Sequence, residues 1–179
     1  MAVQVGFLRA VNLGKRRVSM ARLKGVGEEL GFSDVWTHVN SGNVVFNTSG
    51  TRATIEKTME KALEQEFGFE CTTFVRSAKE LDEALAVQPF ALAPSDTYFI
   101  TFLKRAPSAS QRKALEALSN DFDTLEVHGP DVHWLMHGRS SDSSLVRRDW
   151  EKVLGPLSST SRNVNMLTKL AAKIGSRSA

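Results

Sequence analysis

The sequence contains a single cysteine, Cys71, so neither an intrachain disulfide nor a metal site made only of cysteines can form. It also lacks any apolar run close to the roughly 18–20 residues that a membrane-spanning helix needs. The first residues carry no charged segment followed by a long apolar core, so they do not indicate a secretory signal. We therefore expect a reduced, cytoplasmic protein of bacterial type, with no membrane partner.

Acidic residues are missing from both ends of the chain. Residues 1–27 hold six basic side chains and residues 156–179 hold four, with no Asp or Glu in either segment. The net charge of the 179 residues is +3, and residues 28–155 carry 13 basic against 20 acidic side chains, a balance of −7. This distribution excludes a uniformly basic coat for nucleic acid and predicts one localised positive site on an acidic body.

Hydrophobic spacing in the first half predicts alternating strands and helices. Ser19 is expected to cap a helix that ends at Gly31, and residues 51–67, with an apolar residue at every fourth position, should form a helix ending at Gly68. Short β-branched and aromatic runs predict strands at 3–8, 35–39, 44–47 and 71–75. The first 76 residues therefore predict the β-α-β-β-α-β order of a ferredoxin-like domain.

The second half predicts a smaller α+β unit. Prolines in residues 88–94 mark the expected boundary, which gives a ferredoxin-like domain with its linking helix at 1–88 and a second subdomain at 95–179. The second subdomain predicts the order β-α-β-β-α-α, ending in a helix at 162–174 capped by Ser161. This order is compatible with a degenerate repeat followed by C-terminal helices, although the residues themselves show no repeat.

Three segments combine basic or polar side chains with a loop, a turn or a helix start. Residues 9–17 form a basic loop between a strand and a helix, residues 40–43 form a turn, and residues 159–163 open the last predicted helix. Such positions suit phosphate or carboxylate binding, but they also suit a solvated loop, a hairpin turn and an ordinary helix N-cap. The candidate ligand-binding residues are Arg9, Asn12, Lys15, Ser41, Asn43, Arg162 and Asn163.

No catalytic dyad, cofactor motif or metal motif emerges from the sequence, and whether the protein is an enzyme stays open. His133 and His137 are four residues apart but lack the Glu of the HExxH helix, and on a strand they would lie too far apart to share a metal. Cys71 has no cationic neighbour in the sequence, so we interpret it as a packed strand residue. We expect no metal and no cofactor.

Several stretches resemble the bacterial family called domain of unknown function 1697, whose patterns include "LLRGINVGG…M", "LGF-x-x-V…SGNVVF", "VRS" and "TRNW". The resemblance implies a small cytosolic α+β protein with a ferredoxin-like portion and no assigned activity. The chain departs from the pattern at Ala10, Lys15, Asn40 and Val164, the last standing where the family has Trp. The matching stretches are 7–14, 30–35, 41–46, 75–77 and 161–163.

Three functions are compatible with these features. The favoured one is binding of a small phosphate- or carboxylate-bearing ligand in a cleft between the two halves, where the three polar segments would converge. A single-stranded nucleic-acid module would need Phe7 and Phe46 to stack bases, although both lie in apolar runs typical of a core. A self-associating protein without catalytic activity would pair its basic ends with the acidic body of a second copy. The sequence does not set the oligomeric state.

Overall fold

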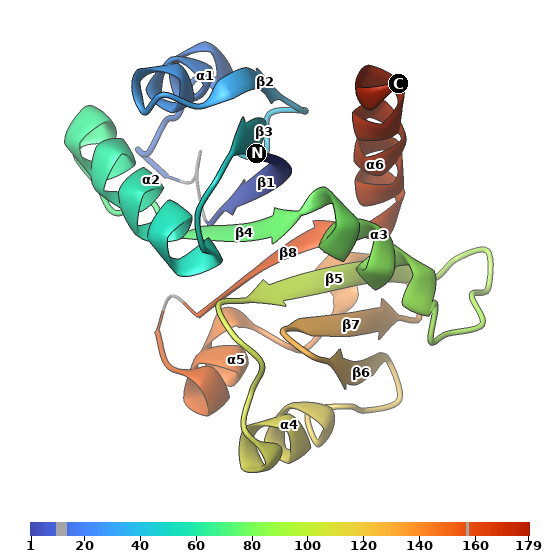
Figure 1. Cartoon of the computed structure of the whole chain (residues 1–179). Helices are drawn as coiled ribbons and strands as arrows, with labels where there is room; N and C mark the ends of the chain where they lie inside the picture. Colours follow the sequence, from blue (N-terminus) through green and yellow to red (C-terminus); the bar gives the residue numbers. More distant parts are fainter. Residues whose placement is uncertain (10–13, 157) are drawn as a thin grey trace. The chain divides into compact units, whose positions relative to one another are not determined.

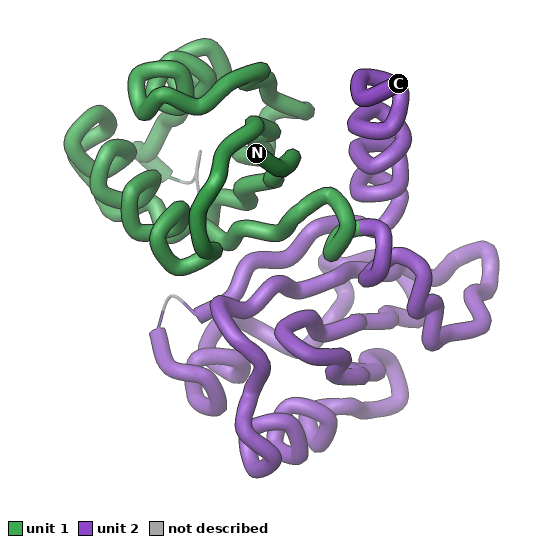
Figure 2. The backbone as a smooth tube through the Cα atoms, viewed as in Figure 1, with its two compact units in different colours: residues 1–81 green, residues 82–179 purple. Residues whose placement is uncertain are grey.

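A computed structural model describes residues 1–9, 14–156 and 158–179. The chain divides into two compact units, residues Met1–Leu81 and Asp82–Ala179, coloured separately in Figure 2. Each unit is built on its own four-stranded sheet, and every strand pair in both sheets is antiparallel. The predicted α+β class is therefore confirmed.

Unit 1 contains the predicted β-α-β-β-α-β order (Figure 1). Its strands follow the spatial order β2-β3-β1-β4, so the first strand lies in the interior of the sheet. The helix α3 (Ala78–Val87) begins directly after the last strand and continues into unit 2. The elements of unit 1 before it are β1 (Ala2–Leu8), α1 (Met20–Glu29), β2 (Ser33–Thr37), β3 (Asn43–Thr48), α2 (Arg52–Phe67) and β4 (Thr73–Ser77).

Local capping signals set the ends of the helices in unit 1. Ser19 accepts a hydrogen bond from the backbone N–H of Arg22 at 3.0 Å and so caps α1 as predicted. Gly68 ends α2 in a left-handed conformation with φ of 75°, and its N–H donates to the Glu64 carbonyl at 2.9 Å. These ends could be predicted because each cap involves residues only a few positions apart.

Unit 2 has the same spatial strand order, β6-β7-β5-β8. The first strand of each unit thus lies between the third and fourth strands of its own sheet. Unit 2 comprises β5 (Thr97–Leu103), α4 (Ala109–Glu116), β6 (Asp123–His128), β7 (Asp131–Met136), the short 3₁₀ turn η1 (Ser140–Asp142), α5 (Arg147–Leu154), β8 (Ser159–Asn163) and α6 (Val164–Ser178).

The strand β8 corrects the sequence prediction for the end of the chain. Residues 159–163 pair with β5, placing Thr160 opposite Phe102, where a helix start capped by Ser161 was expected. The N-cap is Asn163, whose side-chain oxygen accepts from the Asn165 N–H at 2.8 Å. Ser and Thr suit both helix starts and strands, so pairing with a distant strand decides the outcome. With β8, unit 2 completes the same β-α-β-β-α-β order and adds a terminal helix.

The strand registers show how closely the two sheets correspond. In unit 1, Val5 of β1 lies opposite Val45 on one side and Arg76 on the other. In unit 2, Ile100 of β5 lies opposite His133 on one side and Arg162 on the other. The final strand of each unit thus carries an arginine at the same position, although the two sequences are otherwise dissimilar.

Each unit packs its two crossover helices against its sheet. Cys71 belongs to the core of unit 1, where burial raises the pKa of its thiol to about 11, in agreement with a packed role. Among the described residues, no helix is long and apolar enough to span a membrane. The core of unit 1 includes Leu8, Leu23, Val26, Val44, Ile55, Met59, Leu63 and Val75. The core of unit 2 includes Leu115, Leu125, Val127, Val132, Trp134, Met136 and Trp150.

Candidate functional site

In unit 1 the end of β1 lies beside the predicted turn. The Leu8 N–H donates to the Gly42 carbonyl and the Arg9 N–H donates to the Thr72 carbonyl, both at 2.8 Å. The Arg9 side chain follows directly and is only 9% exposed. The structure therefore brings Arg9 close to the segment that carries Ser41 and Asn43.

Asn43 has a clear structural role in this turn. Its side-chain amide donates to the His38 carbonyl at 2.9 Å and to the Ser41 hydroxyl at 2.7 Å. The residue is fully buried as the first residue of β3. Holding the turn closed is thus one function of Asn43, and the Ser41 hydroxyl takes part in it.

The cations of the basic loop differ in their surroundings. Lys15 is exposed, whereas the Arg16 guanidinium lies 5.2 Å from the centre of the Phe69 ring. One nitrogen of Arg17 donates to the carbonyls of Gly14 and Arg16, at 2.8 and 2.7 Å. The candidate Asn12 lies outside the described residues.

Two further cations of the N-terminal segment are paired with acids inside unit 1. Arg22 donates to Glu29 at 2.9 and 3.2 Å and to both carboxylate oxygens of Glu66. This hydrogen bonding by Arg22 holds the pKa of the Glu66 carboxyl below its usual value. Lys24 lies 3.4 Å from Glu28. Two of the six cations of residues 1–27 are therefore paired with acids of the same unit.

Arg162 and Asn163 lie in unit 2, at the junction of β8 and α6. The Arg162 side chain is 8% exposed and donates to the Thr160 hydroxyl at 2.9 Å and to the Ser161 carbonyl at 3.0 Å. Burial lowers the pKa of its guanidinium to about 10. Because the remaining described candidates belong to unit 1, the convergence of the three polar segments stays a prediction.

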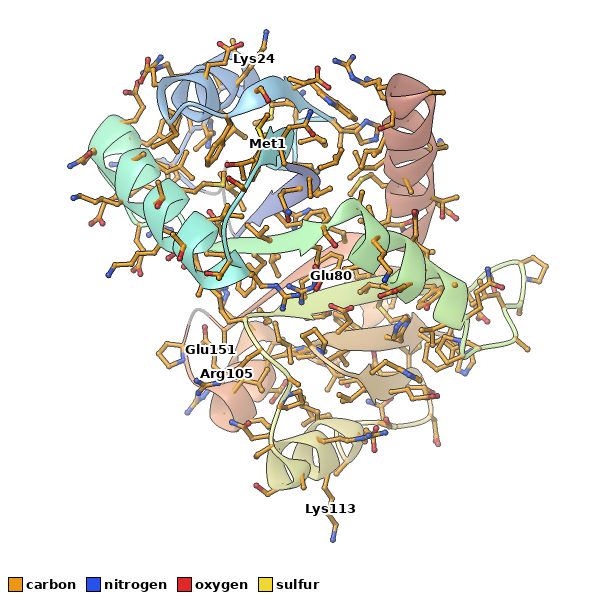
Figure 3. All side chains as sticks on the ribbon, viewed as in Figure 1. Met1, Lys24, Glu80, Arg105, Lys113 and Glu151 are labelled. Carbon is orange, nitrogen blue, oxygen red and sulfur yellow. The ribbon has the colours of Figure 1, made fainter. Side chains whose placement is uncertain are left out.

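A cavity of about 330 Å³ lies within unit 2, between the β5–α4 loop and the connection from α5 to β8. We call it the basic cavity, because its polar side chains are those of Lys104, Arg105, Gln111 and Ser158, and none of the described residues that line it is acidic. Arg105 is exposed and is labelled in Figure 3. The lining of this small volume therefore includes two cations, an amide and a hydroxyl.

The basic cavity lies beside a loop that has a topological counterpart in unit 1. In each unit the first strand leads through a basic loop into a helix capped by serine, Ser19 for α1 and Ser108 for α4. The first loop contains the cations predicted as an anion site, and the second contains Lys104 and Arg105. The sequence prediction missed the second loop because two cations in a short connection are common. The correspondence between the two loops becomes visible only once the two sheets are seen to share one strand order.

A second cavity, of about 340 Å³, also lies in unit 2 and is lined mainly by apolar side chains, including those of Tyr98 and Val164. The Tyr98 hydroxyl is hydrogen-bonded to Nδ1 of His133. His133 is fully buried, and its Nε2 has no hydrogen-bond partner among the described residues. The ring of His128 lies perpendicular to it with centroids 5.1 Å apart.

Burial keeps both members of the Tyr98–His133 pair neutral near pH 7. It lowers the pKa of His133 to about 4, with a smaller contribution from His128, and it raises the pKa of Tyr98. His137 bonds elsewhere, to Asp96 at 3.2 Å. In the part of the chain that is described, no group of three or more His, Cys, Asp or Glu side chains could hold a metal ion.

Comparison with known proteins identifies a family and a fold. Residues 1–133 match the model of a family described as "Protein of unknown function (DUF1697)". The structure is similar to that of the conserved bacterial protein SP0830 from Streptococcus pneumoniae, with a TM-score of 0.70 and 16% identity over 98% of this chain and 99% of that chain. At this identity the likeness concerns the fold alone. No curated protein matches the sequence.

Proposed function

The chain belongs to the DUF1697 family, and we propose that it binds a small ligand carrying a phosphate or carboxylate group in the basic cavity of unit 2. The observation that carries this proposal is the presence of Lys104 and Arg105 around a cavity of about 330 Å³ whose lining, in the described part of the chain, contains no acidic residue. This volume lies at the lower end of the range typical of small-molecule sites.

The lining side chains supply complementary kinds of recognition. The Arg105 guanidinium presents a planar fork that can bind two oxygens of a phosphate or carboxylate, and the Lys104 ammonium adds a point charge. Gln111 accepts from the Ser108 N–H at 3.0 Å through its side-chain oxygen, which leaves its NH₂ group able to donate to a ligand oxygen. The Ser158 hydroxyl donates to the Gly155 carbonyl at 2.6 Å, so its oxygen can accept a hydrogen bond from a protonated group of the ligand.

The residues first chosen from the sequence remain a second proposed location for the same ligand class. Arg9 lies beside the turn of Ser41 and Asn43 in unit 1, and Arg162 lies beside the cap Asn163 in unit 2. Variants of Arg162 therefore belong in the test, because they separate this location from the basic cavity.

Two observations favour a small ligand over the alternative functions. Phe7 and Phe46 are both fully buried, and Phe46 stacks on Phe32 with ring centroids 4.5 Å apart, so these rings do not form an exposed platform for bases. Arg22 and Lys24, which self-association would use against a second copy, pair with acids of their own unit.

Calorimetric titration with inorganic phosphate and with acetate tests the proposal on the full chain. Arg105→Gln and Lys104→Gln should each weaken phosphate binding at least fivefold, because each removes a cation from the cavity. Lys113→Gln is the matched control, since Lys113 is an exposed cation of α4 outside the cavity lining. Unchanged binding in both cavity variants contradicts the proposal, and a loss in Arg162→Gln alone would favour the second location.

A further inference from the structure

The second cavity of unit 2 differs from the basic cavity in its chemistry. It lies among the end of α3, the segment that follows it, β5 and the first half of α6. We call it the apolar cavity. Its lining consists of Leu85, Gln88, Phe90, Leu92, Tyr98, Val164, Thr168 and Ala171.

Among the described residues, none that lines the apolar cavity is charged, and three lining side chains carry polar atoms, those of Gln88, Tyr98 and Thr168. The Tyr98 hydroxyl is already hydrogen-bonded to His133. The Thr168 hydroxyl donates to the Val164 carbonyl one turn earlier in α6, at 2.8 Å, so the helix already uses its proton. Gln88 is therefore the side chain with an amide to offer. A ligand with a net charge would lose its hydration here without gaining an opposite charge.

One wall of the apolar cavity is aromatic and fixed. The rings of Phe90 and Tyr98 meet edge to face, with centroids 5.4 Å apart and planes at 83°. The hydrogen bond between Tyr98 and His133 anchors this wall on the sheet. Burial lowers the pKa of His133 to about 4, so the residue that anchors this wall is neutral at physiological pH.

Gln88 has an unusual backbone conformation at the edge of the apolar cavity. Its φ is +42°, a region that residues other than glycine rarely adopt, and Pro89 follows it directly. Pro89 also disfavours helical conformations in the residue before it. The steric cost of a positive φ and the restriction from Pro89 both oppose this conformation, so the surrounding structure holds Gln88 in it. Strained residues of this kind are concentrated at ligand-binding positions.

From these features we infer that the apolar cavity binds a small, uncharged aromatic molecule with a single hydrogen-bonding group. A cavity of about 150 Å³ lined by apolar side chains is known to hold benzene. A volume of about 340 Å³ therefore suits a ligand of about two fused rings. Leu92 is 55% exposed at this cavity, and such a ligand would cover its apolar surface. The apolar cavity differs from the proposed anion site both in its position and in the charge of the ligand that it would bind.

Ligand-observed NMR and calorimetry with 2-naphthol test this inference on the full chain. The wild-type protein should bind 2-naphthol at least tenfold more tightly than 2-naphthalenesulfonate, which has the same rings and a negative charge. In methyl spectra, 2-naphthol should shift the signals of Leu85, Leu92, Val164 and Ala171. Equal binding of the two probes, or an absence of shifts in these methyl groups, overturns the inference.

A variant that fills the apolar cavity provides a second test of ligand binding there. Val164→Trp should weaken 2-naphthol binding at least tenfold, because the larger side chain occupies the ligand volume. Val146→Trp is the matched control at a site that is 57% exposed and outside the cavity lining, and it should bind as the wild type does. Thermal denaturation and phosphate binding should stay unchanged in a folded Val164→Trp protein. Undiminished 2-naphthol binding by that folded variant contradicts the inference.

The Gln88→Ala variant tests whether the Gln88 amide recognises the polar group of the ligand or only shapes the cavity. The variant should weaken 2-naphthol binding several-fold and leave the binding of naphthalene, which has no hydroxyl, unchanged. An equal loss for both probes would indicate that the side chain shapes the cavity and does not recognise the polar group, and would overturn that part of the inference.

Discussion

Arg76 and Arg162 occupy the same register position in the two sheets of the chain. Arg76 lies opposite Val5 in unit 1, and Arg162 lies opposite Ile100 in unit 2. Both arginines are buried, and both sit on the fourth strand of a sheet with the same spatial order. The two units are therefore topological repeats, and loops at equivalent positions can be compared even where the sequences differ.

A buried glutamate protects the edge of the first sheet. The Glu56 carboxylate on α2 accepts from the Val75 N–H at 3.0 Å, and β4 is the last strand of its sheet. Glu56→Leu removes this acceptor and should lower the free energy of unfolding by about 1–3 kcal/mol. Glu56→Gln keeps a side-chain oxygen and should lose clearly less. Urea denaturation of both variants, with Glu64→Gln as an exposed control on the same helix, measures the difference.

Two glycines should respond to alanine substitution with opposite signs. Gly68 ends α2 with φ of 75°, so Gly68→Ala should lower the free energy of unfolding by about 1 kcal/mol. Gly175 lies inside α6, where an added Cβ would meet no atom within 4 Å, so Gly175→Ala should raise it by roughly 0.5–1 kcal/mol. Thermal and urea denaturation of both variants test the pair, and a change of the same sign in both would contradict the assignment.

The stability of the protein should depend on pH through His133. Its pKa of about 4 in the folded state lies below the ordinary value of 6.5, so the unfolded chain binds the proton more tightly. The contribution of His133 is complete above about pH 6.5 and is lost as the pH falls toward 4, by up to about 3 kcal/mol. His133→Gln should show a shallower fall in unfolding free energy between pH 6.5 and 5 than the wild type. Parallel pH profiles for the two proteins would contradict this prediction.

Sequence patterns predicted the elements whose signals are local. The helix capped by Ser19, the helix expected at residues 51–67 and its end at Gly68 are all present, because caps depend on near neighbours in the chain. The strand at residues 159–163 was wrongly predicted as a helix start, because its pairing with β5 is a long-range interaction. Local propensity cannot reveal such a partner.

The candidate site residues likewise divide into those that the sequence reveals and those that depend on long-range contacts. The cations around Arg9 and Arg162 stand out in the sequence, but their neighbour Arg22 pairs with Glu66, an acid that the sequence places far away. Lys104 and Arg105 become candidates only through a cavity whose lining also includes Ser158, which is distant in the sequence. The pairing of Tyr98 with His133 likewise depends on the register of β5 and β7.

Backbone NMR with inorganic phosphate tests the central claim, anion binding in the basic cavity, most directly. Titration of the full chain should shift the amide signals of Lys104, Arg105, Gln111 and Ser158, saturably and with a single dissociation constant. The same shifts should be weaker in Arg105→Gln and preserved in Lys113→Gln. An absence of saturable shifts at these four residues, or saturable shifts confined to other parts of the chain, would contradict the proposed function.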